Sequence, residues 1–135
     1  MNLEDQVCCL ELSQNLKELG IKQKSQFYYI KPLIIDEEII ENPYYMIAYI
    51  SQIGKIYNNM ISAFTVGELL KLLPLINVSQ IKLLKCSKVE GIYYTCMSPS
   101  VDFNFSDNNP SNAGAKMLIY LIENGLVKVE DINNA

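Results

Sequence analysis

The segment Gln80–Met97 limits the possible folds most, because it has the pattern of a β-hairpin. Two alternating runs, Ile81–Ser87 and Ile92–Met97, flank a turn that contains Glu90 and Gly91. Alternating runs on either side of a glycine-containing turn are typical of two antiparallel strands. This segment therefore predicts part of an antiparallel sheet.

Two more strands are predicted in the first half of the chain. Gln26–Lys31 is aromatic and β-branched and could extend to Ile35, and Tyr44–Ile50 is entirely apolar. These compositions favour strands, and the two runs are close enough along the chain to pair antiparallel. Asp36–Pro43 between them is acidic and turn-like, with one helical turn over Glu37–Glu41 as an alternative.

Two helices are predicted in the first half from hydrophobic spacing and from capping residues. Apolar residues recur every three or four positions over Asn2–Leu19, and Gly20 after them suits the C′ position of a helix. Thr65 and Glu68 form a capping box, in which each side chain bonds the other residue's backbone N–H. A short helix over Val66–Leu73 follows from this box.

A third helix is predicted near the C-terminus. Asn109 is a suitable N-cap, Pro110 suits the first helical position, and the helix is expected to run to Asn124. The segments Ser51–Met60 and Ser98–Asn109 are rich in turn-forming residues and are expected to be loops.

Together these elements predict an α+β fold with an antiparallel sheet of about four strands and three helices packed mainly on one face. The length fits a single globular domain over residues 1–135. Half of the residues are hydrophobic, which excludes global disorder. The predicted core consists of Leu12, Leu16, Leu19, Ile30, Ile47, Leu69, Leu83, Leu118 and Leu121.

The chain contains neither histidine nor arginine. Without histidine, Ser-His and Cys-His nucleophile pairs and histidine-containing zinc sites are impossible. Without arginine, the bidentate contact to guanine is lost, so sequence-specific DNA binding is not expected. No catalytic constellation and no glycine-rich phosphate loop occurs, and no catalytic residue or cofactor is predicted.

The four cysteines, Cys8, Cys9, Cys86 and Cys96, lack the spacing of a metal site. They are expected to be free thiols, as is usual in the cytosol. One hairpin register would place Cys86 opposite Cys96, whereas a register centred on the predicted turn would separate them. No basic, apolar targeting segment and no apolar run of membrane-spanning length is present, so a cytoplasmic protein is expected.

The strongest local charge is the acidic cluster Asp36, Glu37, Glu38 and Glu41. Paired carboxylates can perform acid/base chemistry or hold Mg²⁺, but a solvated acidic loop explains them more simply. Such a cluster could also imitate phosphates for a basic protein surface, which makes it a candidate partner-binding site.

Six of the nine tyrosines occur as adjacent pairs. Neighbouring residues of a strand face opposite sides, so each pair is expected to place one ring in the core and one outside. Exposed tyrosines are enriched at protein interfaces. The candidate partner-binding rings are Tyr28, Tyr45 and Tyr93, unless a helix covers that face and makes them ordinary core residues.

Several segments resemble, in the same order, a group of small phage-associated proteins of unknown function from Bacteroidetes and other low-GC bacteria. The matching segments are Val7–Leu12, Leu16–Gly20, Phe27–Tyr29, Ser62–Leu69 and Ala115–Leu126. The stretch Lys31–Asn59 does not match this group. The resemblance implies a phage or mobile-element context, in which small acidic proteins often inhibit host proteins such as CRISPR nucleases.

The combined expectation is a non-catalytic accessory protein that binds a host protein or a protein–RNA complex. Its sharpest form is an inhibitor of a nucleic-acid-guided defence nuclease, because acidic surfaces are attracted to basic channels. The alternative is a small enzyme that uses carboxylate or tyrosine chemistry on a nucleotide or a sugar.

Overall fold

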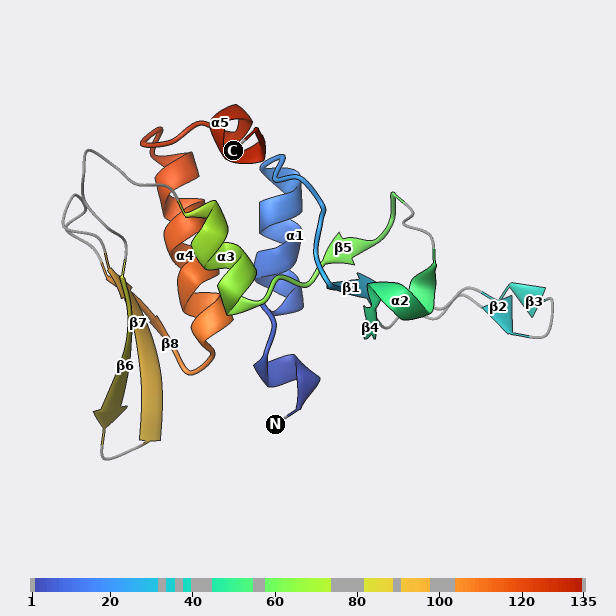
Figure 1. Ribbon diagram of the computed structural model, residues 1–135, viewed down its shortest axis with the longest axis horizontal. Coiled ribbons are helices and arrows are strands. Elements are labelled where there is room, and N and C mark those ends of the chain that lie inside the picture. Colours follow the sequence, from blue (N-terminus) through green and yellow to red (C-terminus); the bar gives the residue numbers. More distant parts are fainter. Residues whose placement is uncertain are drawn as a thin grey trace.

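The structure is a computed structural model. It describes residues 2–31, 34–35, 38–39, 45–54, 58–73, 82–88, 91–97 and 104–134. Four helices form the centre of the molecule: α1 (Leu10–Glu18), α3 (Val66–Leu72), α4 (Pro110–Glu123) and α5 (Val129–Asn133). Figure 1 shows α1 beside α4, with α3 in front of them and α5 at one end.

The described strands form three separate sheets rather than one. One three-stranded sheet has the order β4-β1-β5 and another has the order β6-β7-β8, and the strands β2 and β3 pair with each other. The strands are β1 (Phe27–Ile30), β2 (Ile34–Ile35), β3 (Glu38–Ile39), β4 (Met46–Tyr49), β5 (Ile61–Ser62), β6 (Lys82–Lys88), β7 (Gly91–Met97) and β8 (Phe105–Asp107).

The helices lie between the two three-stranded sheets (Figure 1). The predicted α+β class and the antiparallel pairing are therefore confirmed, whereas a single four-stranded sheet covered on one face is wrong. α4 contributes to this arrangement, because it contacts β7 and β8 as well as α1 and α3. Eight of its residues are buried.

The two strands predicted in the first half pair as expected. β1 lies antiparallel to β4, with Tyr29 opposite Ile47, and it also pairs with β5 on its other edge. β4 is followed directly by the short helix α2 (Ile50–Ile53), which lies in a segment that was expected to be a loop. The predicted extension of the first strand to Ile35 is instead the separate pair β2-β3.

The predicted hairpin is confirmed as β6 and β7, but its register differs from both alternatives. Cys96 lies opposite Leu83, and Cys86 lies opposite Tyr93. The two cysteines are therefore not paired across the ladder, and the Cys96 thiol is free and buried. β8 adds a third strand to this sheet within the polar segment that was expected to be a loop.

The ends of the predicted helices agree with the structure, except at the start of α1. Gly20 has a φ of 94°, and its N–H donates to Lys17 while the N–H of Ile21 donates to Leu16, which is a Schellman motif. The helix does not begin near Asn2. A short 3₁₀ turn, η1 (Leu3–Asp5), comes first, and the chain then extends so that the Cys8 N–H donates to the Phe64 carbonyl at 2.8 Å.

The capping box and the Asn109 cap are both confirmed. The Glu68 N–H donates to Thr65 Oγ1 at 3.2 Å, and the Thr65 N–H donates to Glu68 Oε1 at 2.9 Å. Asn109 Oδ1 accepts from the N–H groups of Ser111 and Asn112 at 2.8 and 3.4 Å. α5 was not predicted.

The predicted core is confirmed around the helices. Leu16, Leu69, Leu118 and Leu121 are fully buried, and Leu12 and Leu19 pack against them. Ile47 belongs to a second, smaller cluster around Val7 and Phe27, Ile30 is half-buried, and the side chain of Leu83 lies outside the described part of the chain. No helix in the described ranges is long and apolar enough to cross a membrane.

Candidate partner-binding groove

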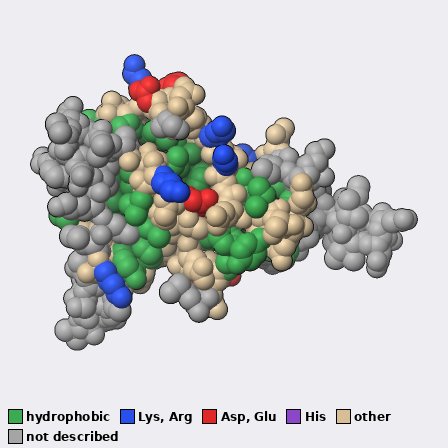
Figure 2. Space-filling view, in the orientation of Figure 1, with side chains coloured by type: hydrophobic (Ala, Val, Ile, Leu, Met, Phe, Trp, Pro, Cys, Tyr) green, Lys and Arg blue, Asp and Glu red, His purple; other side chains and the backbone are tan. Residues whose placement is uncertain are grey.

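A groove of about 630 Å³ lies between the N-terminal segment and strands β1 and β4. It lies at the end of the molecule where hydrophobic side chains reach the surface near these strands (Figure 2). Its lining consists of Asn2, Leu3, Glu4, Cys9, Leu10, Tyr29, Tyr45, Met46 and Ile47. We refer to it as the β4 groove.

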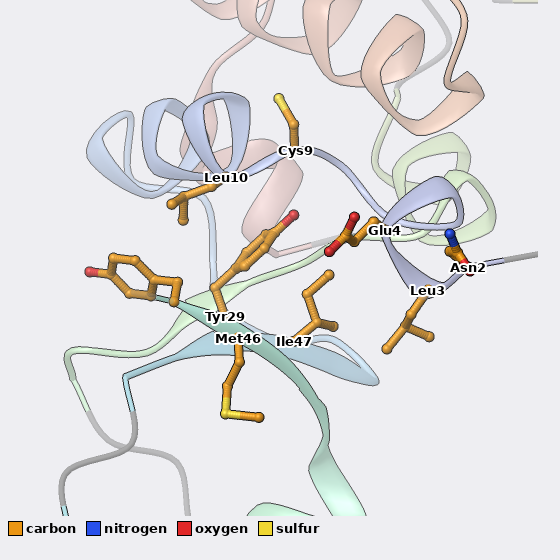
Figure 3. Close-up of a pocket in the computed structure, with 9 residues that line it drawn as sticks. Asn2, Leu3, Glu4, Cys9, Leu10, Tyr29, Met46 and Ile47 are labelled. Carbon is orange, nitrogen blue, oxygen red and sulfur yellow. The ribbon is translucent and has the colours of Figure 1, made fainter. Parts of the chain in front are cut away.

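The floor of the β4 groove comes from paired positions of β1 and β4. Tyr29 and Ile47 lie opposite each other in the ladder, and Figure 3 shows both side chains rising toward Leu10 and Glu4. The Tyr29 hydroxyl donates to the Cys8 carbonyl at 2.7 Å. Burial raises the pKa of Tyr29 well above its usual value, so the phenol stays protonated and keeps this hydrogen bond.

Beside the β4 groove, β4 and the residue that follows it carry exposed apolar side chains. Met46 is 51% exposed, Tyr49 46% and Ile50 41%, and the side chain of Met46 points away from the groove floor (Figure 3). Tyr49 packs on Phe27 with ring centroids 4.5 Å apart. β4 is an edge strand of its three-stranded sheet, which explains why its apolar residues remain uncovered.

Of the predicted tyrosines, only Tyr45 lies in the β4 groove. It is half-buried, and Lys31 Nζ lies 4.7 Å from its ring centroid in a cation–π contact. The choice of Tyr28 as an outward ring is wrong, because its exposed fraction is 0% and that of Tyr29 is only 8%. β1 is the central strand of its sheet, so rings on both of its faces are covered.

The other predicted residues remain untested. Asp36, Glu37 and Glu41 lie outside the described residues. Glu38 pairs through its backbone with Ile35 in the β2-β3 ladder, but its side chain lies outside the description. The backbone of Tyr93 lies in β7, and its side chain is not described either.

Sequence reasoning missed Cys9, which is the most acidic thiol among the described residues. The pKa of Cys9 is lowered to about 6, because the Cys8 thiol and the Leu12 N–H at the start of α1 both donate hydrogen bonds to its sulfur. The bond from Cys8 has the larger effect, and burial acts in the opposite direction. Its position as N-cap of α1 is the sequence signal that could have identified it. Its sulfur points away from the other groove side chains (Figure 3), so it is not aimed at a ligand there.

The ionisable groups at the β4 groove are few among the described residues. Glu4 is the one carboxylate among the described residues that line it. Within the described ranges, no three His, Cys, Asp or Glu side chains are grouped so that they could hold a metal ion.

Comparisons with known proteins give no further guide to the function. No family model, no curated protein and no solved structure matches this chain.

Proposed function

We propose that the protein is a non-catalytic binding protein of phage or mobile-element origin that acts in the cytoplasm of a bacterial host. Its β4 groove and the adjoining edge strand take up an apolar segment of a host protein or of a protein–RNA complex. The most specific version of this proposal is that the protein inhibits a nucleic-acid-guided defence nuclease.

The observation that carries this proposal is the exposed apolar surface beside the groove. Of the five large hydrophobic side chains that are strongly exposed in the described part of the chain, three are Met46, Tyr49 and Ile50. Exposed apolar side chains next to a concave site favour a protein interaction site. An edge strand can also add a partner's strand through its free backbone groups.

The choice of a nuclease as the partner rests on charge and on the sequence resemblance. The chain has a net charge of −4, and basic channels of nucleic-acid enzymes attract acidic surfaces and accelerate association. The acidic cluster Asp36, Glu37, Glu38 and Glu41 would supply this attraction, while the β4 groove would supply the contact that holds the complex.

The groove is tested by Met46→Glu with Leu126→Glu as the matched control. Both residues are large, apolar and about half exposed, at 51% and 47%, but only Met46 lines the groove. Nucleic-acid-guided nucleases are purified with their guides, and the affinity and the inhibition of cleavage are measured for each variant. A charge at the centre of an apolar contact is expected to weaken binding about tenfold or more, and the control is expected to bind like the wild type.

Equal affinities for Met46→Glu and the wild type would exclude the exposed apolar surface of β4 beside the groove as the contact surface. The broader proposal fails if the protein inhibits no nuclease, protects no phage from a host defence and recovers no partner from the host.

The acidic cluster is tested separately by replacing its four carboxylates with amides. Because exposed charges contribute little to stability, the fold is expected to remain intact. The association rate is expected to fall and to become less dependent on salt. Unchanged association kinetics across a salt series would show that this cluster does not guide the encounter.

A further inference from the structure

A second hollow of about 410 Å³ carries the opposite charge to the protein as a whole. It is lined by Lys22, Lys24, Phe64, Glu68, Lys71, Leu72, Ile132 and Asn133, and we call it the lysine cleft. Figure 2 shows lysine side chains around an acidic side chain in the middle of the visible face, where α3 lies in Figure 1. None of its lining residues belongs to the β4 groove.

The three lysines of the cleft have no acidic partner within the described part of the chain. Other lysines of the described part of the chain do have partners: Lys116 forms an ion pair with Asp107 at 2.9 Å, and Lys17 donates to the Met60 carbonyl at 2.8 Å. Lys22, Lys24 and Lys71 are all exposed, and no side-chain hydrogen bond or ion pair is formed by them among the described residues.

The carboxylate inside the cleft offsets one of the three positive charges, and its oxygens are held by hydrogen bonds within the fold. Glu68 Oε1 accepts from the Ser25 hydroxyl at 2.8 Å and from the Thr65 N–H at 2.9 Å. Glu68 Oε2 accepts from the Gln26 N–H at 3.1 Å. With three ammonium groups and one carboxylate, the cleft keeps an excess of positive charge in a chain whose net charge is −4.

The walls of the cleft are held in place by Asn133. Its Oδ1 accepts from the Lys22 N–H at 2.8 Å, and its Nδ2 donates to the Gly20 carbonyl at 2.9 Å. These bonds fix α5 against the segment that carries two of the lysines. The floor is apolar and consists of Phe64, Leu72 and Ile132. Fixed walls reduce the entropy that a ligand would lose on binding.

We propose that the lysine cleft binds a small molecule that carries two or more phosphate groups, such as a nucleoside diphosphate. Lysine is a common phosphate ligand because its ammonium group acts as a compact positive charge. A hollow of about 410 Å³ lies within the usual range of small-ligand sites, about 300–1,000 Å³. The lysines surround one cleft with an apolar floor, which fits a compact anion better than an extended nucleic-acid backbone.

The test uses pyrophosphate and ADP as probes, with titration calorimetry on the purified full chain. Lys71→Gln and Lys22→Gln each remove one ammonium group from the cleft, and Lys85→Gln removes an exposed lysine on β6 as the matched control. Both probes are expected to bind at a single site. Each cleft variant is expected to lose about tenfold in affinity, and the control is expected to change less than about twofold. Circular dichroism of each variant verifies the fold.

The proposal is overturned if neither probe binds at millimolar concentration, or if Lys85→Gln weakens binding as much as the cleft variants do. A single-stranded RNA is titrated in a separate experiment. If the RNA binds more tightly than ADP and the same variants lose RNA binding, the cleft is a nucleic-acid site and the proposal is wrong. Because the β4 groove is untouched, this result is independent of nuclease inhibition.

Discussion

Replacing Asn109 should show how strongly the N-terminal segment is held against α4. The Asn109 side chain does two things at once. Its Oδ1 caps α4 by accepting from the Ser111 N–H at 2.8 Å, and its Nδ2 donates to the carbonyls of Val7 at 2.9 Å and Glu4 at 3.3 Å. These carbonyls belong to the segment that forms one wall of the β4 groove.

The magnitudes follow from separating the two roles. Asn109→Ser keeps a capping oxygen, since serine is as good an N-cap as asparagine, whereas Asn109→Ala removes it at a cost of about 1 kcal/mol. Both variants leave the carbonyl of Val7, a fully buried residue, without the Asn109 donor, which costs about 1–2 kcal/mol. The expected losses in the free energy of unfolding are therefore about 1–2 kcal/mol for serine and about 2–3 kcal/mol for alanine.

Thermal and urea unfolding measure these differences, with Asn104→Ala, an exposed asparagine before β8, as the control. For a chain of 135 residues, each kcal/mol lowers the Tm by about 3–6 °C. If Asn109→Ser is as stable as the wild type, the bonds to the N-terminal segment contribute nothing. If the serine and alanine variants are equal, the cap contributes nothing.

Three further predictions concern ionisable groups. Glu68→Gln should lower the free energy of unfolding by about 1–3 kcal/mol, because its charge-assisted bonds tie the start of α3 to Ser25 and Gln26. The exposed Glu123→Gln should change it by less than about 0.5 kcal/mol, and equal urea midpoints would contradict this. The alkylation rate of Cys9 by iodoacetamide should rise with pH through a midpoint of about 6, because the thiolate is the nucleophile. Buried Cys96, with a pKa raised to about 11, should stay unmodified. A midpoint for Cys9 near 8.5, the value of a free thiol, would refute this prediction. Burial acts to raise the pKa of Asp107, but the Asn109 N–H and the Lys116 ammonium group outweigh this effect and hold the pKa below its usual value. The charged form of Asp107 therefore stabilises the fold above pH ~4, and this stabilisation is lost as the pH falls through the folded-state pKa. Unfolding at a series of pH values should therefore show Asp107→Asn less stable than the wild type near pH 6, with the gap closing in acid; a constant gap would contradict the linkage.

The groove itself could be predicted only in part from the sequence. Tyr45 was singled out because it belongs to a tyrosine pair, and it lies in the groove. Met46 and Ile47 were predicted to lie in an entirely apolar strand, but such a run does not show which side chains stay uncovered, and Met46 is 51% exposed. The contribution of Leu3 and Glu4 could not be foreseen, because no sequence pattern states that the N-terminal turn lies across β4.

Apart from the start of α1, the ends of the predicted helices were determined by the sequence alone, since the groups that end a helix lie within a few residues of it. Gly20 accepts a positive φ that other residues rarely adopt, and the Thr65–Glu68 box and the Asn109 cap each satisfy free N–H groups of the helix that follows. These bonds form in the same way wherever the helix packs.

Tertiary structure alone decided how the strands are grouped, where α1 begins and which tyrosines are covered. The Cys8 N–H bonds the distant Phe64 carbonyl, which keeps residues 7–9 extended and delays the helix to Leu10. α4 packs on β7 and β8 and also contacts α1 and α3, so the helices separate the two three-stranded sheets. Tyr28 is buried because its strand acquires neighbours on both edges. Each outcome depends on contacts between segments far apart in the chain, and local sequence patterns specify which elements form but not which distant partner they meet.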